Sequence, residues 1–243
     1  MTNSSIAPGL TGAKFATFGS PIENKWGHIS FRAGISGSGI TAANNSGIWA
    51  DKGRSRLLVT RTGLSAPGAA GGVFAVLGDP VYNGADQVAF RGVLTAGVAG
   101  ITSTNSVGIW ANTTGALALV ARTQSQAVMC PAGARFSLFR QFALPEAGGV
   151  IFLADLELGG GGVTAANNQG IWVADSAGKL KLVARKGDGI VIDGAIRKIS
   201  TLTIFTSTPE AGAQTRSFNI SRHLVYRAGF TDGTQGVFET AAP

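Results

Sequence analysis

Two histidines are the residues of this chain with the clearest potential for acid–base or metal chemistry. His28 and His223 each stand just before a predicted strand, at equivalent places in two sequence repeats, where the other repeats carry Gln87 and Gly149. A zinc site takes three or four clustered ligands, and no carboxylates cluster beside either histidine. We therefore interpret both as turn histidines, and we predict no catalytic residue, no metal site and no cofactor.

The other nucleophiles and acids also lack the spacing of an active site. The 13 carboxylates fall mostly in or beside turns, where aspartate hydrogen-bonds to nearby backbone. No Gly-x-Ser-x-Gly segment is present to form a nucleophile elbow, and Gly34–Gly39 lacks the Gly-Lys-Ser/Thr ending of a phosphate-binding loop. Cys130 is the only cysteine, so no intrachain disulfide can form. These features predict a protein that is not an enzyme.

Tryptophans are the best candidates for a binding surface. Trp49, Trp110 and Trp172 recur at intervals of 61 and 62 residues, and one such ring per unit would suit a multivalent lectin that stacks on sugars. A tryptophan after Gly-Ile in a strand is better explained by packing, because buried aromatic rings dominate core energetics. Packing is therefore the favoured interpretation, and glycan binding is the alternative. Trp26 lies in a turn without a counterpart, and we predict that it contacts a ligand or a partner.

These tryptophans belong to a repeat that covers the whole chain. Gly47-Ile48-Trp49 returns as Gly108-Ile109-Trp110, as Gly170-Ile171-Trp172 and, altered, as Gly236-Val237-Phe238. A Leu-Val-x-Arg segment follows the first three copies, and an alternating apolar segment such as Ile29–Arg32 precedes each copy. Alternation predicts strands with one core-facing side. We expect the arginines that recur at the ends of these strands to be structural: Arg32, Arg61, Arg91, Arg122, Arg185 and Arg227.

The repeat predicts an all-β fold of about four units, each with ~60 residues and four short strands. The units run roughly over residues 5–63, 64–124, 125–188 and 189–243 of a single repeat domain spanning 1–243. Four strands per unit are typical of a small β-propeller. A β-sandwich made of the same hairpins is the alternative, because strand count alone does not fix the packing.

Three segment types together resemble a family of large bacterial secreted tandem-repeat proteins. Their patterns are Gly-Ile-Trp, Leu-Val-Ala-Arg-x-Gly-Asp and Gly-Gln-Val-Ala-Phe-Arg, matched here by segments such as Val88–Arg91 and Leu182–Asp188. The resemblance implies a β-propeller-like, surface-associated protein without assigned chemistry. Only Arg185–Asp188 keeps the Arg-x-Gly-Asp turn, and Leu153 replaces the strand arginine in the third repeat. A ligand set repeated in every unit is therefore not expected.

Charge and hydropathy restrict the partners and the location. The net charge of +7 comes from few acids (13) rather than dense bases (20), and without basic runs or nucleic-acid-binding motifs we expect no nucleic acid partner. No apolar run of 18 residues predicts a membrane span, and the first residues lack a signal-peptide pattern. Abundant Gly, Ala, Ser, Thr and Asn suggest an extracellular or cell-surface protein.

The fourth repeat lacks a strand. Met1 aligns with Thr60, and the printed chain ends soon after its fourth Gly-Ile-Trp copy, so three Leu-Val-x-Arg strands serve four units. A closing unit built from both termini would leave unpaired backbone groups that can template another chain. We predict a self-associating, non-enzymatic structural protein, a homo-oligomer that forms a filament where contacts do not close. The predicted interface residues are Ile6, Ala7, Gly236, Val237 and Phe238.

Overall fold

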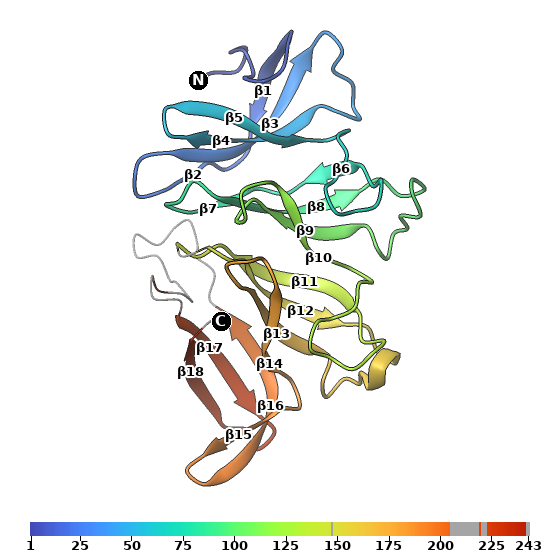
Figure 1. The fold of residues 1–243 in the computed structure, drawn as a ribbon, viewed down its shortest axis with the longest axis vertical. Coiled ribbons are helices and arrows are strands. Elements are labelled where there is room, and N and C mark those ends of the chain that lie inside the picture. The colour runs from blue at the N-terminus through green and yellow to red at the C-terminus, as the bar shows by residue number, and fades with distance from the viewer. Residues whose placement is uncertain (147, 205–218, 220–222, 242–243) are drawn as a thin grey trace. The chain divides into compact units, whose positions relative to one another are not determined.

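The chain folds into antiparallel β-sheets (Figure 1). The computed structural model describes residues 1–146, 148–204, 219 and 223–241. Among these residues the single helical element is a short 3-10 helix, η1, at Gly160–Gly162. The all-β prediction is confirmed, with four antiparallel sheets. No helix in the described part of the chain is long and apolar enough to cross a membrane.

The first compact unit, unit 1, spans Met1–Arg122 and holds two sheets. The first sheet has the order β1-β3-β4-β5, with β2 beside β3, and its strands are β1 Ala13–Phe18, β2 Ile22–Glu23, β3 Ile29–Gly37, β4 Ser46–Lys52 and β5 Ser55–Arg61. The second sheet has the order β6-β8-β9-β10, with β7 beside β8, and its strands are β6 Phe74–Leu77, β7 Val81–Tyr82, β8 Val88–Leu94, β9 Val107–Ala111 and β10 Ala118–Arg122.

The second compact unit, unit 2, spans Thr123–Pro243 and also holds two sheets. The third sheet has the order β11-β12-β13-β14, and its strands are β11 Phe136–Ala143, β12 Ile151–Leu156, β13 Gln169–Ala174 and β14 Leu180–Arg185. The fourth sheet has the order β15-β16-β17-β18, and its strands are β15 Gly189–Ile192, β16 Ala195–Ile204, β17 His223–Phe230 and β18 Gln235–Ala241.

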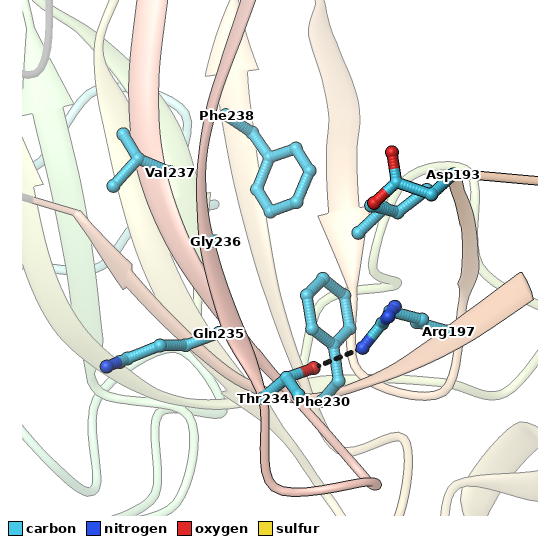
Figure 2. Close-up of a pocket in the computed structure, with 9 residues that line it drawn as sticks. Asp193, Arg197, Phe230, Thr234, Gln235, Gly236, Val237 and Phe238 are labelled. Atoms are coloured by element: carbon cyan, nitrogen blue, oxygen red, sulfur yellow. Dashed lines mark hydrogen bonds between the residues drawn. The ribbon is translucent and has the colours of Figure 1, made fainter. Parts of the chain in front are cut away.

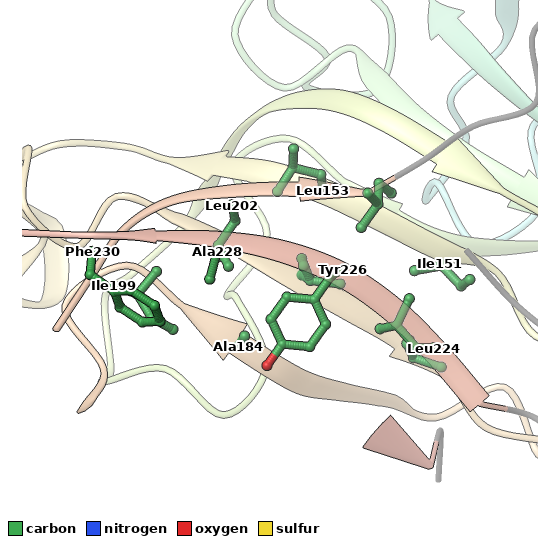
Figure 3. Close-up of a cluster of buried hydrophobic side chains, with 12 residues drawn as sticks. Ile151, Leu153, Ala184, Ile199, Leu202, Leu224, Tyr226, Ala228 and Phe230 are labelled. Atoms are coloured by element: carbon green, nitrogen blue, oxygen red, sulfur yellow. The ribbon is translucent and has the colours of Figure 1, made fainter. Parts of the chain in front are cut away.

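The two sheets of each unit pack face to face. In unit 2, Ile151 and Leu153 of β12 share a buried cluster with Leu224 and Tyr226 of β17 (Figure 3). In unit 1, Ile48 of β4 and the second sheet share another cluster. Middle strands are consequently covered on both sides, and all six residues of β12 are buried. The predicted division into a core face and an exposed face is therefore wrong for such strands.

The three Gly-Ile-Trp tryptophans are fully buried in their own sheets. The ring of Trp172 stacks on Phe152, with centroids 5.9 Å apart, and meets Phe136 edge-on at 4.9 Å. Its indole Nε1 donates a hydrogen bond to the carbonyl oxygen of Val128 at 3.0 Å. Unit 1 repeats both the ring contacts and this bond. The predicted packing role of these tryptophans is confirmed.

The glycine two residues before each tryptophan leaves room for the tryptophan ring. A Cβ added at Gly170 would lie 2.7 Å from Cη2 of Trp172, and the equivalent distances are 2.7 Å at Gly47 and 2.6 Å at Gly108. Contacts this short do not occur between real carbon atoms, so a larger residue would displace the ring. The Gly-Ile-Trp pattern is therefore a packing motif in which glycine and tryptophan form one element.

Replacing Gly170 by alanine should lower the free energy of unfolding by about 1–3 kcal/mol, because the added methyl group overpacks the Trp172 ring. Urea denaturation followed by circular dichroism measures this loss. Ser176→Ala, in the exposed turn between β13 and β14, is the matched control and should change stability by less than about 0.5 kcal/mol. A Gly170→Ala variant as stable as the wild type would contradict the packing role of the glycine.

The recurring strand arginines divide into two groups. Arg185 is buried, and its Nε donates a hydrogen bond to the carbonyl oxygen of Asn167 at 2.7 Å. Arg32 forms an ion pair with Asp79 at 2.9 Å. Arg91 and Arg227 are exposed, so the predicted structural role is not supported for them. Strand-end position alone did not distinguish a covered arginine from a solvated one.

Candidate functional site

In the first three sheets a closing strand lies beside the Gly-Ile-Trp strand. β5, β10 and β14 occupy this place next to β4, β9 and β13. Each sets a leucine opposite the tryptophan, as Leu182 is paired with Trp172 in the third sheet. The pairing continues past the strand end, where Lys186 N donates to the carbonyl oxygen of Gln169 at 2.8 Å. These three sheets thus show the same closed edge.

The fourth sheet lacks this closing strand. β18 carries Gly236-Val237-Phe238 and pairs with β17, and no strand in the described part of the chain pairs with its other side. The bond from Phe230 N to Thr234 O, at 2.8 Å, fixes the alternation of hydrogen-bonded pairs in this hairpin. The backbone N–H and C=O groups of Val237 and Glu239 therefore point away from β17. They form an open strand edge.

A pocket of about 350 Å³ adjoins this open edge (Figure 2). Ile192 and Arg197 of the β15–β16 hairpin line it, together with Phe230 and Phe238. Phe238 meets Phe230 edge-on, with ring centroids 5.9 Å apart. Gly236 and Val237 also line the pocket, so the structure brings together three of the five predicted interface residues. A wall of mixed apolar and polar side chains thus lies beside unpaired strand backbone.

Sequence differences in the fourth repeat explain why this pocket exists. Phe238 replaces the tryptophan and supplies a smaller ring without an indole N–H. In the second sheet a loop that includes Ala66–Gly68 precedes β6. The fourth sheet has the β15–β16 hairpin at this place. No leucine of a closing strand lies opposite Phe238 among the described residues. Each difference leaves space that the other repeats fill.

Besides Asp193, Arg197 supplies a charged group to the pocket. Its Nη1 donates to Oδ2 of Asp232 at 2.8 Å and to Oγ1 of Thr234 at 2.7 Å (Figure 2 shows the Thr234 bond). Hydrogen bonds from Thr234 and the charge of Arg197 lower the pKa of Asp232, so this carboxylate stays ionised near neutral pH. The buried Nε of Arg197 has no partner in the described part of the chain.

The two N-terminal residues of the predicted interface belong to the first sheet. Ala7 is fully buried, and its backbone N donates to Ala13 O at 3.0 Å. Ile6 forms a β-bridge with Lys14, although its side chain is 74% exposed. The fourth sheet is built from residues 189–241 alone. The prediction of a closing unit made from both termini is therefore wrong, because β15 supplies a fourth strand at the opposite edge.

A polar cluster connects the turns of the two sheets of unit 1. Oδ1 of Asp86 accepts hydrogen bonds from Asn24 Nδ2 at 2.9 Å, His28 Nδ1 at 2.8 Å and Tyr82 OH at 2.7 Å, and Oδ2 accepts one from Gly53 N at 3.2 Å. Burial raises the pKa of Asp86, but these hydrogen bonds outweigh it and hold the pKa below its ordinary value. Asp86 is thus an ionised structural hub.

Trp26 lies at the surface beside this cluster. Its side chain is 65% exposed, and its indole Nε1 donates to Gly84 O at 2.8 Å. The ammonium nitrogen of Lys25 lies 5.1 Å from the ring centroid. The exposed ring is therefore held in place, as the prediction of a contact residue requires. The three other tryptophans offer no exposed ring to a sugar.

Asparagines that precede the histidines were missed in the sequence. The backbone N of His28 donates to Asn24 Oδ1 at 3.2 Å, and that of His223 to Asn219 Oδ1 at 2.9 Å. Gln87 bonds to Asn83 in the same way. An asparagine stands four residues before His28, Gln87 and His223, and this shared spacing is the sequence signal for the cap. The backbone N of each histidine is thus capped by an asparagine four residues earlier, and no group of three metal-binding side chains occurs among the described residues.

Comparison with known proteins identifies the class of the chain. It belongs to a family of unknown function, DUF7453, whose model matches residues 1–242. No curated protein matches the sequence. The family match covers all four sheets and carries no assigned chemistry.

Proposed function

We propose that this protein is a non-enzymatic structural protein that self-associates by adding a polypeptide strand to the open edge of β18. The observation that supports this most directly is the outer side of β18 at Val237, with which no described strand pairs, whereas β4, β9 and β13 each pair with a closing strand there. Outward-pointing backbone groups and a pocket with the rings of Phe230 and Phe238 in its wall accompany this residue. Strand addition satisfies such groups and fills such pockets.

The proposal includes a propeller-like arrangement and an extracellular location. Face-to-face packing of consecutive sheets within each unit supports blades that cover one another, and a β-sandwich is the alternative. The composition, low in charge and rich in small polar residues, supports a location outside the cell or on its surface. When a contact joins two different surfaces of identical chains and does not close, it extends into a filament.

The open edge can be blocked by a single substitution. Val237→Pro removes a backbone N–H that points away from β17, so β18 keeps its bonds to β17 but accepts no further strand. Analytical ultracentrifugation should show concentration-dependent oligomers of the wild type and monomers of Val237→Pro. Val191→Pro is the matched control, because Val191 is 68% exposed on the opposite edge strand of the same sheet.

The control should self-associate like the wild type. A wild-type protein that remains monomeric up to about 300 µM, a concentration at which even weak contacts associate, would sink the proposal. Equal loss of association in Val191→Pro and Val237→Pro would show that β18 is not the specific edge. Circular dichroism establishes that both variants keep their β content.

A further inference from the structure

Resting on the proposed function, we infer that the strand added to β18 is an antiparallel segment of the Leu-Lys-Leu-Val-Ala-Arg type, as in Leu180–Arg185. Three closing strands within this protein show what such an edge accepts. The third sheet is the closest template, because β13 and β18 carry their glycine and aromatic residue in the same register relative to the preceding strand.

The register of the template assigns a partner to each residue of β18. In the third sheet Arg185 is paired with Gly170, Ala184 with Ile171 and Leu182 with Trp172, with a bulge at Val183. Transferred to the fourth sheet, the arginine lies opposite Gly236, the alanine opposite Val237 and the leucine opposite Phe238. The alanine would cover part of Val237, and backbone bonds would reach its outward-pointing groups.

The leucine of the added strand fits the pocket beside Phe238. In the first sheet the equivalent Leu58 packs in the same cluster as Trp49, and a Cβ at Gly47 would lie 3.2 Å from Leu58 Cδ1. The fourth sheet keeps the glycine and the aromatic ring but has the pocket where this leucine would stand. Filling it with a leucine removes apolar surface of both chains from water.

Charge distinguishes this segment from the other closing strands. Lys181 is paired with Val173, and the counterpart of Val173 in β18 is Glu239. Opposite charges across a strand pair stabilise it, while like charges destabilise it. The closing strands β5 and β10 place Leu57 and Ala118 at this position. Glu239, whose Oε1 also lies 2.6 Å from His223 Nδ1, therefore favours a strand with lysine there, and it discourages indiscriminate pairing at the edge.

A labelled peptide of residues 178–188, added to the full-length protein, tests this inference by fluorescence anisotropy. We expect saturable binding, and the Leu182→Asp peptide should bind at least about tenfold more weakly, because the pocket loses an apolar side chain. The Lys181→Glu peptide should bind about two- to fivefold more weakly. The Glu239→Lys protein should bind the Lys181→Glu peptide more tightly than the 178–188 peptide. A non-specific apolar contact would not produce this reversal.

Equal binding of the 178–188 and Leu182→Asp peptides, or no binding up to about 1 mM, would overturn the inference. Its failure is distinguishable from that of the proposed function. Self-association that Val237→Pro abolishes, in a protein that ignores the peptide, would leave strand addition intact and reject this partner. Peptide binding by a protein that stays monomeric would support the partner and reject self-association.

Discussion

Replacing Trp172 by alanine is expected to lower the free energy of unfolding of unit 2 by about 3–5 kcal/mol. The side chain is fully buried between Phe152 and Phe136, so its removal leaves a large cavity. It also leaves the carbonyl oxygen of Val128 without the indole donor. Urea denaturation followed by far-ultraviolet circular dichroism measures the loss, and hydrogen exchange assigns it to unit 2.

Two other tryptophan variants provide the controls. Trp172→Phe keeps an aromatic ring but loses the indole N–H, as in the fourth repeat with Phe238, and should be less destabilising than alanine. Trp26→Ala removes a largely exposed ring and should cost about 1 kcal/mol or less. If Trp172→Ala and Trp26→Ala destabilise the protein equally, burial of the repeated tryptophans does not organise the sheets.

Replacing Asp86 by alanine is expected to destabilise unit 1 by about 2–4 kcal/mol, because several buried donors lose their acceptor at once. The side chain of Asn24 is among them, and it is buried. Asp79→Ala is the matched control: its carboxylate is 44% exposed in a surface pair with Arg32, and its removal should cost less than about 1 kcal/mol. Equal effects of the two substitutions would contradict the hub role.

The same aspartate predicts a dependence on pH. Its pKa is lower in the folded protein than in the unfolded chain, so its stabilising contribution is present above the unfolded pKa of about 3.9. That contribution is lost as the pH falls through the folded pKa. The wild type should therefore lose more stability than Asp86→Asn between about pH 5 and pH 2. Parallel stability–pH curves would contradict this prediction.

The sequence was sufficient for features that repeat. Three Gly-Ile-Trp copies and three Leu-Val-x-Arg copies predicted strands and packed tryptophans. The tryptophans could be predicted because the same contact, a ring lying over a glycine, occurs in each Gly-Ile-Trp copy. The copies also located the edge strand at Gly236–Phe238. The fourth repeat was harder, since β15 extends over four residues what is a single β-bridge in each other repeat, and this length could not be anticipated from them.

Single-occurrence contacts could not be predicted in this way. The bonds of Asp86 to Asn24 and His28 join residues about 60 positions apart, and each partner alone looks like an ordinary turn residue. The pocket beside Phe238 depends on a hairpin and a missing strand together. The N-terminal residues were misassigned because their repeat position suggested a free segment, whereas Ala7 is hydrogen-bonded within the first sheet.

Amide hydrogen exchange along β18, measured at low and high protein concentration, tests the strand-addition account most directly. The account predicts that the amides of Val237 and Glu239 exchange freely in the monomer and become protected in the oligomer, because they donate to an added strand. Val191, on the opposite edge strand, should exchange rapidly at both concentrations. Unprotected Val237 and Glu239 amides in a sample that consists of oligomers would contradict the account.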